Sequence, residues 1–151
     1  MDVVLLLADA AQVDPAGKIH ALGIGWDQTS SPTAPSAVLV LVQVPWTDTN
    51  RKHRLVLQLR DADGRPVSVT TPVGEQLVAV TADFEVGRPP GIAPGTVQTV
   101  KLAPTIGPLP LAPNRYEWHA EIDGETQDGW SAPFTVQGPH ITQTGEASAA
   151  S

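Results

Sequence analysis

Glutamate and histidine alternate in a short stretch near the C-terminal end of the chain, NRYEWHAEI (114–122). Glu117, His119 and Glu121 are two residues apart, so on a β-strand they share one face and are spaced by about 6.5–7 Å. Two neighbours of this row could bind one metal ion, but all three could do so only if the strand bent. The positions between them are apolar: Tyr116, Trp118, Ala120 and Ile122. This alternation favours a strand with a buried side and a polar side that faces water.

Other sequence patterns that signal catalysis are missing from the chain. There are no cysteines, which excludes thiol catalysis and cysteine-ligated metals. The nucleophile motif G-x-S-x-G, the phosphate-binding P-loop and the zinc motif H-E-x-x-H do not occur. The GIG at 23–25 precedes Trp26 and a proline-containing loop rather than a helix, so it does not indicate a dinucleotide site. We therefore predict a protein that is not an enzyme and that has no cofactor and no metal, and we do not favour a small-molecule ligand.

One basic cluster interrupts an otherwise acidic chain, and its members are Arg51, Lys52, His53 and Arg54. As a functional feature, this cluster is the candidate interaction surface, which could bind an acidic partner. The alternative is a solvated turn that leads into a strand, with Arg54 facing outward. The second interpretation needs no partner, and we favour it.

Charge and composition exclude several classes of partner. The net charge of −7 repels polyphosphate and anionic membranes, so we expect neither nucleic-acid nor membrane binding. The first residues, MDVVLLLAD, lack the basic start of a signal peptide, and their apolar run is too short to span a bilayer. These features and the lack of cysteines predict a cytoplasmic protein.

Short apolar stretches separated by turns predict β-strands along the whole chain. Residues 3–8 read as a strand covered on both faces, and we expect it to pair in a hairpin with 18–26. The most apolar stretch, 37–46, predicts a strand in the middle of a sheet. It is followed by one helical turn at 47–52, with Thr47 or Asp48 as its N-cap.

The second half of the chain continues the pattern. Residues 53–61 lead into the turn dipeptide Asp63–Gly64, and 74–87 read as one alternating strand. Further strands are expected at 96–102, around Trp118 and at 130–137. The proline-rich segment 103–114 predicts an extended crossover between two sheets.

These elements predict an all-β fold, an antiparallel two-sheet sandwich of immunoglobulin-like kind with about eight short strands. Tyr116 follows a turn and precedes the inward-facing Trp118 by two residues, which is the arrangement of a tyrosine corner. We predict a single domain over residues 1–137 and a flexible C-terminal tail over residues 138–151.

Four stretches together resemble a family of small bacterial proteins, mainly from actinobacteria, whose function is unknown. They are LLLADAAQVDPAGKIHALGIGWD, VQVPWTDTNRKHRLVLQLRDADGRPV, FEVGRPPGIAPGT and LPLAPNRYEWHAEIDGE, and the resemblance covers about residues 2–137. It implies an immunoglobulin-like β-sandwich that is soluble and cytoplasmic. It supplies no catalytic or binding residues.

Three functional hypotheses remain open from the sequence. The first is a non-enzymatic protein that acts through contact with a protein partner or by self-association through a sheet edge or face. The second is a structural accessory or decoration protein of a phage or other large assembly. The third is a ligand- or carbohydrate-binding module that uses exposed Trp26, Trp46 or Trp130 as stacking platforms.

Overall fold

The computed structural model describes residues 1–138 and is all-β, as predicted. Its strands are β1 (Asp2–Ala8), β2 (Ala10–Val13), β3 (Ile19–Leu22), β4 (Gln28–Thr29), β5 (Ser36–Val44), β6 (Lys52–Asp61), β7 (Ser68–Thr71), β8 (Gly74–Leu77), β9 (Ala79–Glu85), β10 (Gln98–Leu102), β11 (Thr105–Ile106), β12 (Asn114–Ile122) and β13 (Ser131–Val136). The strands are more numerous than the eight or so that we predicted, because short extra strands flank the long ones.

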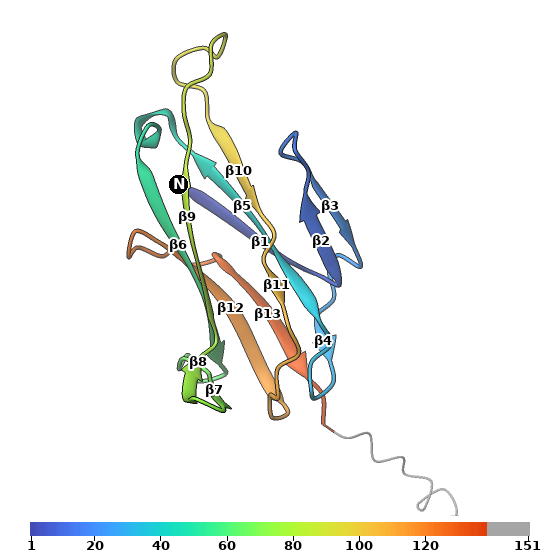
Figure 1. Cartoon of the computed structure of the whole chain (residues 1–151). Helices are drawn as coiled ribbons and strands as arrows, with labels where there is room; N and C mark the ends of the chain where they lie inside the picture. The colour runs from blue at the N-terminus through green and yellow to red at the C-terminus, as the bar shows by residue number, and fades with distance from the viewer. Residues whose placement is uncertain (139–151) are drawn as a thin grey trace, which may run out of the picture.

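The long strands form two sheets (Figure 1). One sheet has the order β1-β5-β10, and β11 also pairs with β5. The other has the order β4-β13-β12-β6-β9. All pairings in the two sheets are antiparallel except that of β4 with β13, which is parallel. Two separate hairpins, β2-β3 and β7-β8, extend from these sheets.

Strand β5 lies in the middle of its sheet, as the apolar stretch 37–46 predicts. Val42 pairs with Val3 of β1 on one side and with Val100 of β10 on the other. Most of the strand is buried on both faces; only Leu41 is half-buried, and Gln43 is exposed. A β-branched apolar sequence is stable in this position because both of its faces are removed from water.

Side chains from both sheets form one hydrophobic core. Every second residue of a strand contributes, as the period of two requires: Leu55, Leu57 and Leu59 from β6, and Tyr116, Trp118, Ala120 and Ile122 from β12. The inward-facing aliphatic residues of β5 complete this core from the other sheet. The alternation predicted for these strands is confirmed.

The prediction for the first strand is wrong in two respects. Val4 and Leu6 are exposed, so β1 is not covered on both faces. Strand β1 pairs with β5, and the hairpin partner of β3 is β2 (Ala10–Val13). A run that is apolar at every position carries no signal that distinguishes the covered face from the uncovered one.

The stretch 74–87 is divided into β8 and β9 by Val78, where we had predicted a single strand. The N–H of Val78 donates to the carbonyl of Val67, while its own carbonyl accepts from the N–H of Leu59. Val78 therefore joins the β7-β8 hairpin to the five-stranded sheet. The helical turn expected at 47–52 is present as the 3-10 turn η1 (Trp46–Asp48), but Pro45 precedes it and no side chain caps it.

The proline-rich segment crosses from one sheet to the other, as predicted. Strand β11, inside this segment, pairs with β5, and the chain then enters β12 of the other sheet. Near the end of the crossover, the hydroxyl of Tyr116 donates a hydrogen bond of 2.6 Å to the carbonyl of Ala112. This bond is the one expected of a tyrosine corner. The predicted tail (138–151) lies, apart from Gly138, outside the described residues.

Candidate functional site

The row of Glu117, His119 and Glu121 lies on the outer side of β12, where all three side chains are half-buried. The closest approach in the row is 3.4 Å, between His119 Nδ1 and Glu117 Oε1. Its geometry does not make a hydrogen bond, because His119 Nδ1 has no hydrogen-bond partner among the described residues. The two groups are neighbours without a directional bond.

His119 has a structural role through its other ring nitrogen. Nε2 lies 2.6 Å from the hydroxyl oxygen of Thr126, and that hydroxyl donates to the carbonyl of Ala120 at 2.8 Å. A hydroxyl has one proton, so Nε2–H is the donor to Thr126. The imidazole therefore anchors the turn between β12 and β13. Among residues 1–138, no group of three or more histidine and carboxylate side chains could hold a metal ion.

The basic cluster that formed the candidate interaction surface is divided between two sides of β6. Lys52 and Arg54 point outward, and Arg51 pairs with Asp48 in the preceding turn. Arg54 Nε lies 3.1 Å from Asp83 on β9. His53 points inward and is 3% exposed, so its inclusion in a surface was wrong. The strand alternation that exposes Lys52 and Arg54 necessarily turns the residue between them toward the core.

His53 connects three parts of the chain at one end of the molecule. Its Nδ1 lies 2.6 Å from Asp123 Oδ2, in the turn after β12, and its Nε2 lies 2.7 Å from the carbonyl oxygen of Asp48 in η1. Its ring stacks on Phe84 of β9, with the ring centroids 5.3 Å apart. Both ring nitrogens of this buried side chain therefore have a polar partner within hydrogen-bond distance.

Asp123 is held as a carboxylate by the groups around it. The hydrogen bond from His53, and then the bond of 2.9 Å from the N–H of Arg54, lower the pKa of Asp123 below its ordinary value. Its backbone has a φ of +53°, and its N–H donates to the carbonyl of Arg54 at 3.0 Å. Asp123 therefore fixes the turn at the end of β12 to the start of β6.

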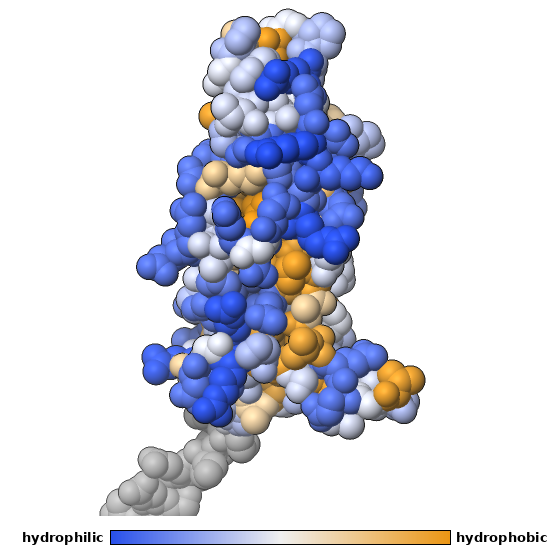
Figure 2. Space-filling view, turned by 90° about the vertical axis from the view of Figure 1, so that its left-hand side faces the viewer, coloured by the Kyte–Doolittle hydropathy of each residue, from blue (hydrophilic) through white to orange (hydrophobic). Residues whose placement is uncertain are grey.

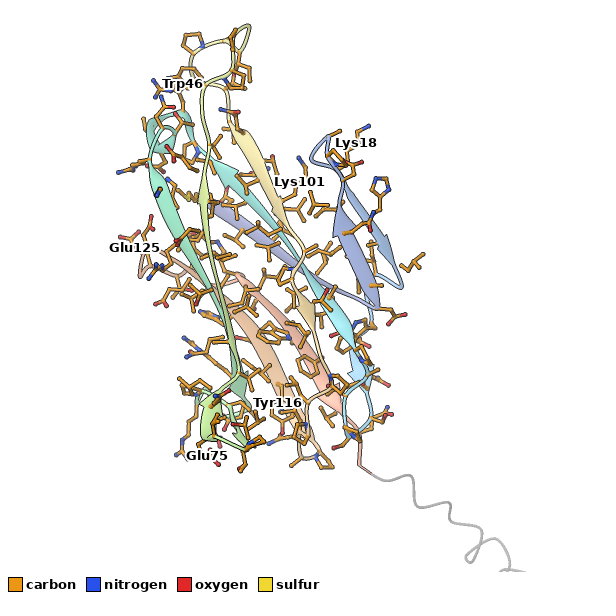
Figure 3. All side chains as sticks on the ribbon, in the orientation of Figure 1. Lys18, Trp46, Glu75, Lys101, Tyr116 and Glu125 are labelled. Atoms are coloured by element: carbon orange, nitrogen blue, oxygen red, sulfur yellow. The ribbon has the colours of Figure 1, made fainter. Side chains whose placement is uncertain are left out.

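A small hollow of about 140 Å³ lies beside this histidine. It is lined by Met1, Asp48, Arg51, His53, Ile122, Asp123, Glu125, Gln127 and Trp130. Glu125 lies in the turn between β12 and β13 (Figure 3). The polar side chains of the lining include three carboxylates, and the contacts of His53 hold Asp48 and Asp123 in place.

None of the tryptophans that we considered as stacking platforms is among the exposed large hydrophobic residues. Trp130 is buried in the core, as is Trp118. Trp26 is half-buried and packs edge-on against Phe134, with the centroids 5.4 Å apart. Trp46 is half-buried, and the guanidinium of Arg88 lies 4.2 Å from the centre of its ring.

The first part of the chain carries most of the exposed large hydrophobic residues, which the sequence did not indicate. Eight large hydrophobic residues are exposed within the described part of the chain, and five of them precede Trp26: Val4, Leu6, Val13, Leu22 and Ile24. Val4 and Leu6 lie on the outer side of β1. The other three belong to the β2-β3 hairpin and the turn after it, and Leu22 and Ile24 line an open hollow of about 660 Å³. We call these five residues the N-terminal apolar surface.

Comparison with known proteins places the chain in a family without assigning a function. Residues 3–137 match the model of a family of unknown function, DUF6941. The match covers most of the chain, so the protein belongs to this family, in agreement with the resemblance found in its sequence. A search of curated proteins finds no match. Among the described residues, no helix is long and apolar enough to cross a membrane.

Proposed function

We propose that this protein is a non-catalytic, immunoglobulin-like β-sandwich that acts through protein–protein contact. Three features support the fold assignment. The two sheets have the orders β1-β5-β10 and β4-β13-β12-β6-β9. A short strand, β4, pairs in parallel with the last strand. The hydroxyl of Tyr116 bonds to the backbone of Ala112 at the start of β12.

The observation that carries the contact role is the N-terminal apolar surface. Leu22 is 73% exposed and Val4 is 50% exposed. Full burial of one such side chain against a partner would contribute about 1.5–3 kcal/mol to the free energy of binding, and the isolated chain does not gain this contribution. Contiguous exposed apolar patches on a soluble fold mark contact surfaces more often than single exposed residues do.

The β2-β3 hairpin has the shape of a contact arm. It stands beside the β1-β5-β10 sheet, and Lys18 lies at its tip (Figures 1 and 3). His20 is exposed and bonds to Asp14 across the turn, with 2.7 Å between Nε2 and Oδ2. Gly23 must remain glycine here, because a Cβ would lie 2.1 Å from the Asp9 carboxylate and the backbone φ is +66°. The N–H of Asp9 donates to the carbonyl of Leu22, and the N–H of Gly25 donates to the carbonyl of Leu7, so the base of the hairpin is tied to β1. A constrained arm loses little conformational entropy on binding.

A capture experiment with three forms of the chain tests this proposal. The immobilised wild-type chain, the variant Leu22→Asp and the variant Thr135→Asp are each exposed to the same lysate. Thr135 is on β13 in the other sheet, and it controls for the added charge. We expect a protein that is retained by wild type and Thr135→Asp and lost with Leu22→Asp. Equal retention by all three forms would contradict the proposal.

A further inference from the structure

Strand β9 (Ala79–Glu85) is an unprotected edge of the five-stranded sheet. It ends the five-stranded sheet, and no described strand pairs with its other side. The opposite edge is covered in part by β4, and β13 beneath it contains Pro133. In the other sheet, the edge strand β10 is short, carries Lys101 and ends before Pro104. The opposite edge strand of that sheet, β1, is covered in part because the N–H of Gly25 donates to the carbonyl of Leu7. Proline, lysine and short length are the usual devices against edge pairing, and β9 has none of them.

Half of the backbone groups of β9 point away from the sheet. The N–H of Leu59 donates to the carbonyl of Val78, which sets the alternation along the antiparallel pair of β6 and β9. The residues that bond to β6 are then Val80, Ala82 and Phe84. The residues whose N–H and C=O groups face outward are Ala79, Thr81, Asp83 and Glu85.

The core is also incompletely covered on this side. Val80 on β9 and Val100 and Leu102 on β10 pack against the core but remain half-exposed. The inward-facing residues of β1 and β13, at the other side of the two sheets, are buried. Figure 2 shows an apolar strip between hydrophilic residues on the side of the molecule where β6 and β9 lie. A further strand beside β9 would cover this strip.

We propose that the missing strand is β9 of a second copy of this chain, paired in antiparallel around a twofold axis at Ala82. This inference rests on the proposed contact role and names a partner and a second surface for it. The outward-facing groups then pair with one another: Thr81 with Asp83 of the second copy, and Ala79 with its Glu85. The apolar residues Val80 and Phe84 also meet across the axis.

The charges of β9 favour this register over its neighbour. In the register centred on Ala82, Asp83 and Glu85 each lie opposite a neutral residue of the second copy. A register centred on Asp83 would place two aspartates opposite each other. Within each copy, Arg54 lies 3.1 Å from Asp83, and Lys52 pairs with Glu85 in the strand register. The net charge of −7 on each copy opposes association, so added salt should strengthen the dimer.

Sedimentation velocity of the purified chain, at several protein and salt concentrations, tests the dimer. We expect a dimer that becomes tighter with salt. Thr81→Pro removes an outward N–H and should weaken dimerisation at least tenfold, whereas Thr81→Ala keeps that N–H and should dimerise like wild type. A wild-type chain that stays monomeric at all conditions, or a Thr81→Pro chain that dimerises equally well, would overturn the inference.

Disulfide trapping provides a readout that does not depend on the proline variant. The chain has no cysteine, so Ala82→Cys introduces the only thiol, directly at the proposed axis. Mild oxidation should convert Ala82→Cys into a covalent dimer and leave Thr99→Cys, on the β10 edge, monomeric. Equal trapping of both, or trapping of Thr99→Cys alone, would refute the β9 pairing. Capture of a partner through Leu22 by a monomeric chain would leave the proposed function standing and reject only this inference.

Discussion

In both sheets, alternate residues of each strand face outward. These outward-facing residues are mainly charged on the five-stranded sheet and mainly apolar on the β1 side of the other sheet. On the five-stranded sheet, side chains of opposite charge lie across from each other: Lys52 and Glu85, Arg54 and Asp83, Arg60 and Glu117. On the β1-β5-β10 sheet, the corresponding positions hold Val4, Leu6 and Leu41, with Leu39 buried among them. Charged side chains are well solvated by water, whereas the exposed apolar side chains would gain free energy if another surface covered them.

This difference teaches that a contact surface should be sought among the outward-facing residues of a strand rather than among the inward-facing ones. The inward-facing residues of both sheets are aliphatic or aromatic and belong to one core. They are therefore similar in the two sheets and do not indicate which sheet has a contact surface. The outer residues decide whether a sheet is finished by solvent or by another surface. On that basis we place the proposed contact role on the β1 side and not on the charged row around His119.

Truncation of two neighbouring residues on β12 should have very different effects on the stability of the protein. Trp118 is buried, and Trp118→Ala should cost about 3–5 kcal/mol in the free energy of unfolding. Glu117→Ala, on the charged face of the same strand, should change it by less than about 0.5 kcal/mol. Urea unfolding of both variants measures the contrast. Similar costs for the two would mean that the outer face is part of the packed structure.

The same contrast is expected on β6, where His53 lies between two outward-facing cations. His53→Ala leaves the acceptors on Asp48 and Asp123 without their donor and should cost about 1–3 kcal/mol. Lys52→Ala is the matched control, and its stability should equal that of wild type. Thermal unfolding followed by circular dichroism compares them. A wild-type melting curve for His53→Ala would contradict the account of how the three turns are held.

Acid should weaken the His53 and Asp123 contact in a defined direction. The folded-state pKa of Asp123 is lowered from 3.8, mainly by the bond from His53. This contribution is therefore fully present above the unfolded-state pKa and is lost as the pH falls through the lower folded-state pKa. Urea unfolding at pH 6 and at pH 3 should show a smaller acid loss for Asp123→Asn than for wild type. Equal losses would exclude Asp123 as a source of the acid sensitivity.

Removal of the tyrosine-corner bond should have a smaller effect than these changes. Tyr116→Phe keeps the ring, which stacks on Phe134 at 5.8 Å, and removes only the bond to the carbonyl of Ala112. We expect a loss of about 0.5–1.5 kcal/mol in urea unfolding. Tyr116→Leu, which also removes the ring, should cost more. No loss in Tyr116→Phe would mean that water replaces the bond at no cost.

Strand alternation made most of the fold predictable, and its failures have one physical cause. Trp118, Leu57 and Val42 were assigned to the core correctly because polar residues alternate with apolar ones or the whole stretch is apolar and central. In β1 every residue from Val3 to Ala8 is apolar, so the sequence could not show that Val4 and Leu6 face outward. Pairing partners are set by contacts distant in sequence, which local patterns do not contain.

The candidate site was harder to predict than the fold. Arg51, Lys52, His53 and Arg54 look alike as a charged run, yet strand geometry turns His53 alone toward the core. Its partner Asp123 is remote in sequence, and the dipeptide Asp123–Gly124 predicts a turn there but not its contact with His53. The N-terminal apolar surface depends on how the β2-β3 hairpin is placed beside β1 and β5, which composition does not reveal.

Site-specific photo-crosslinking in cells tests the central claim most directly. A photoreactive amino acid is placed at Val4, at Leu22 or, on the charged face, at Glu117. We predict that positions 4 and 22 give the same discrete protein adducts and that position 117 gives none. Adducts from position 117 alone, or none from positions 4 and 22, would contradict a contact role for the N-terminal apolar surface.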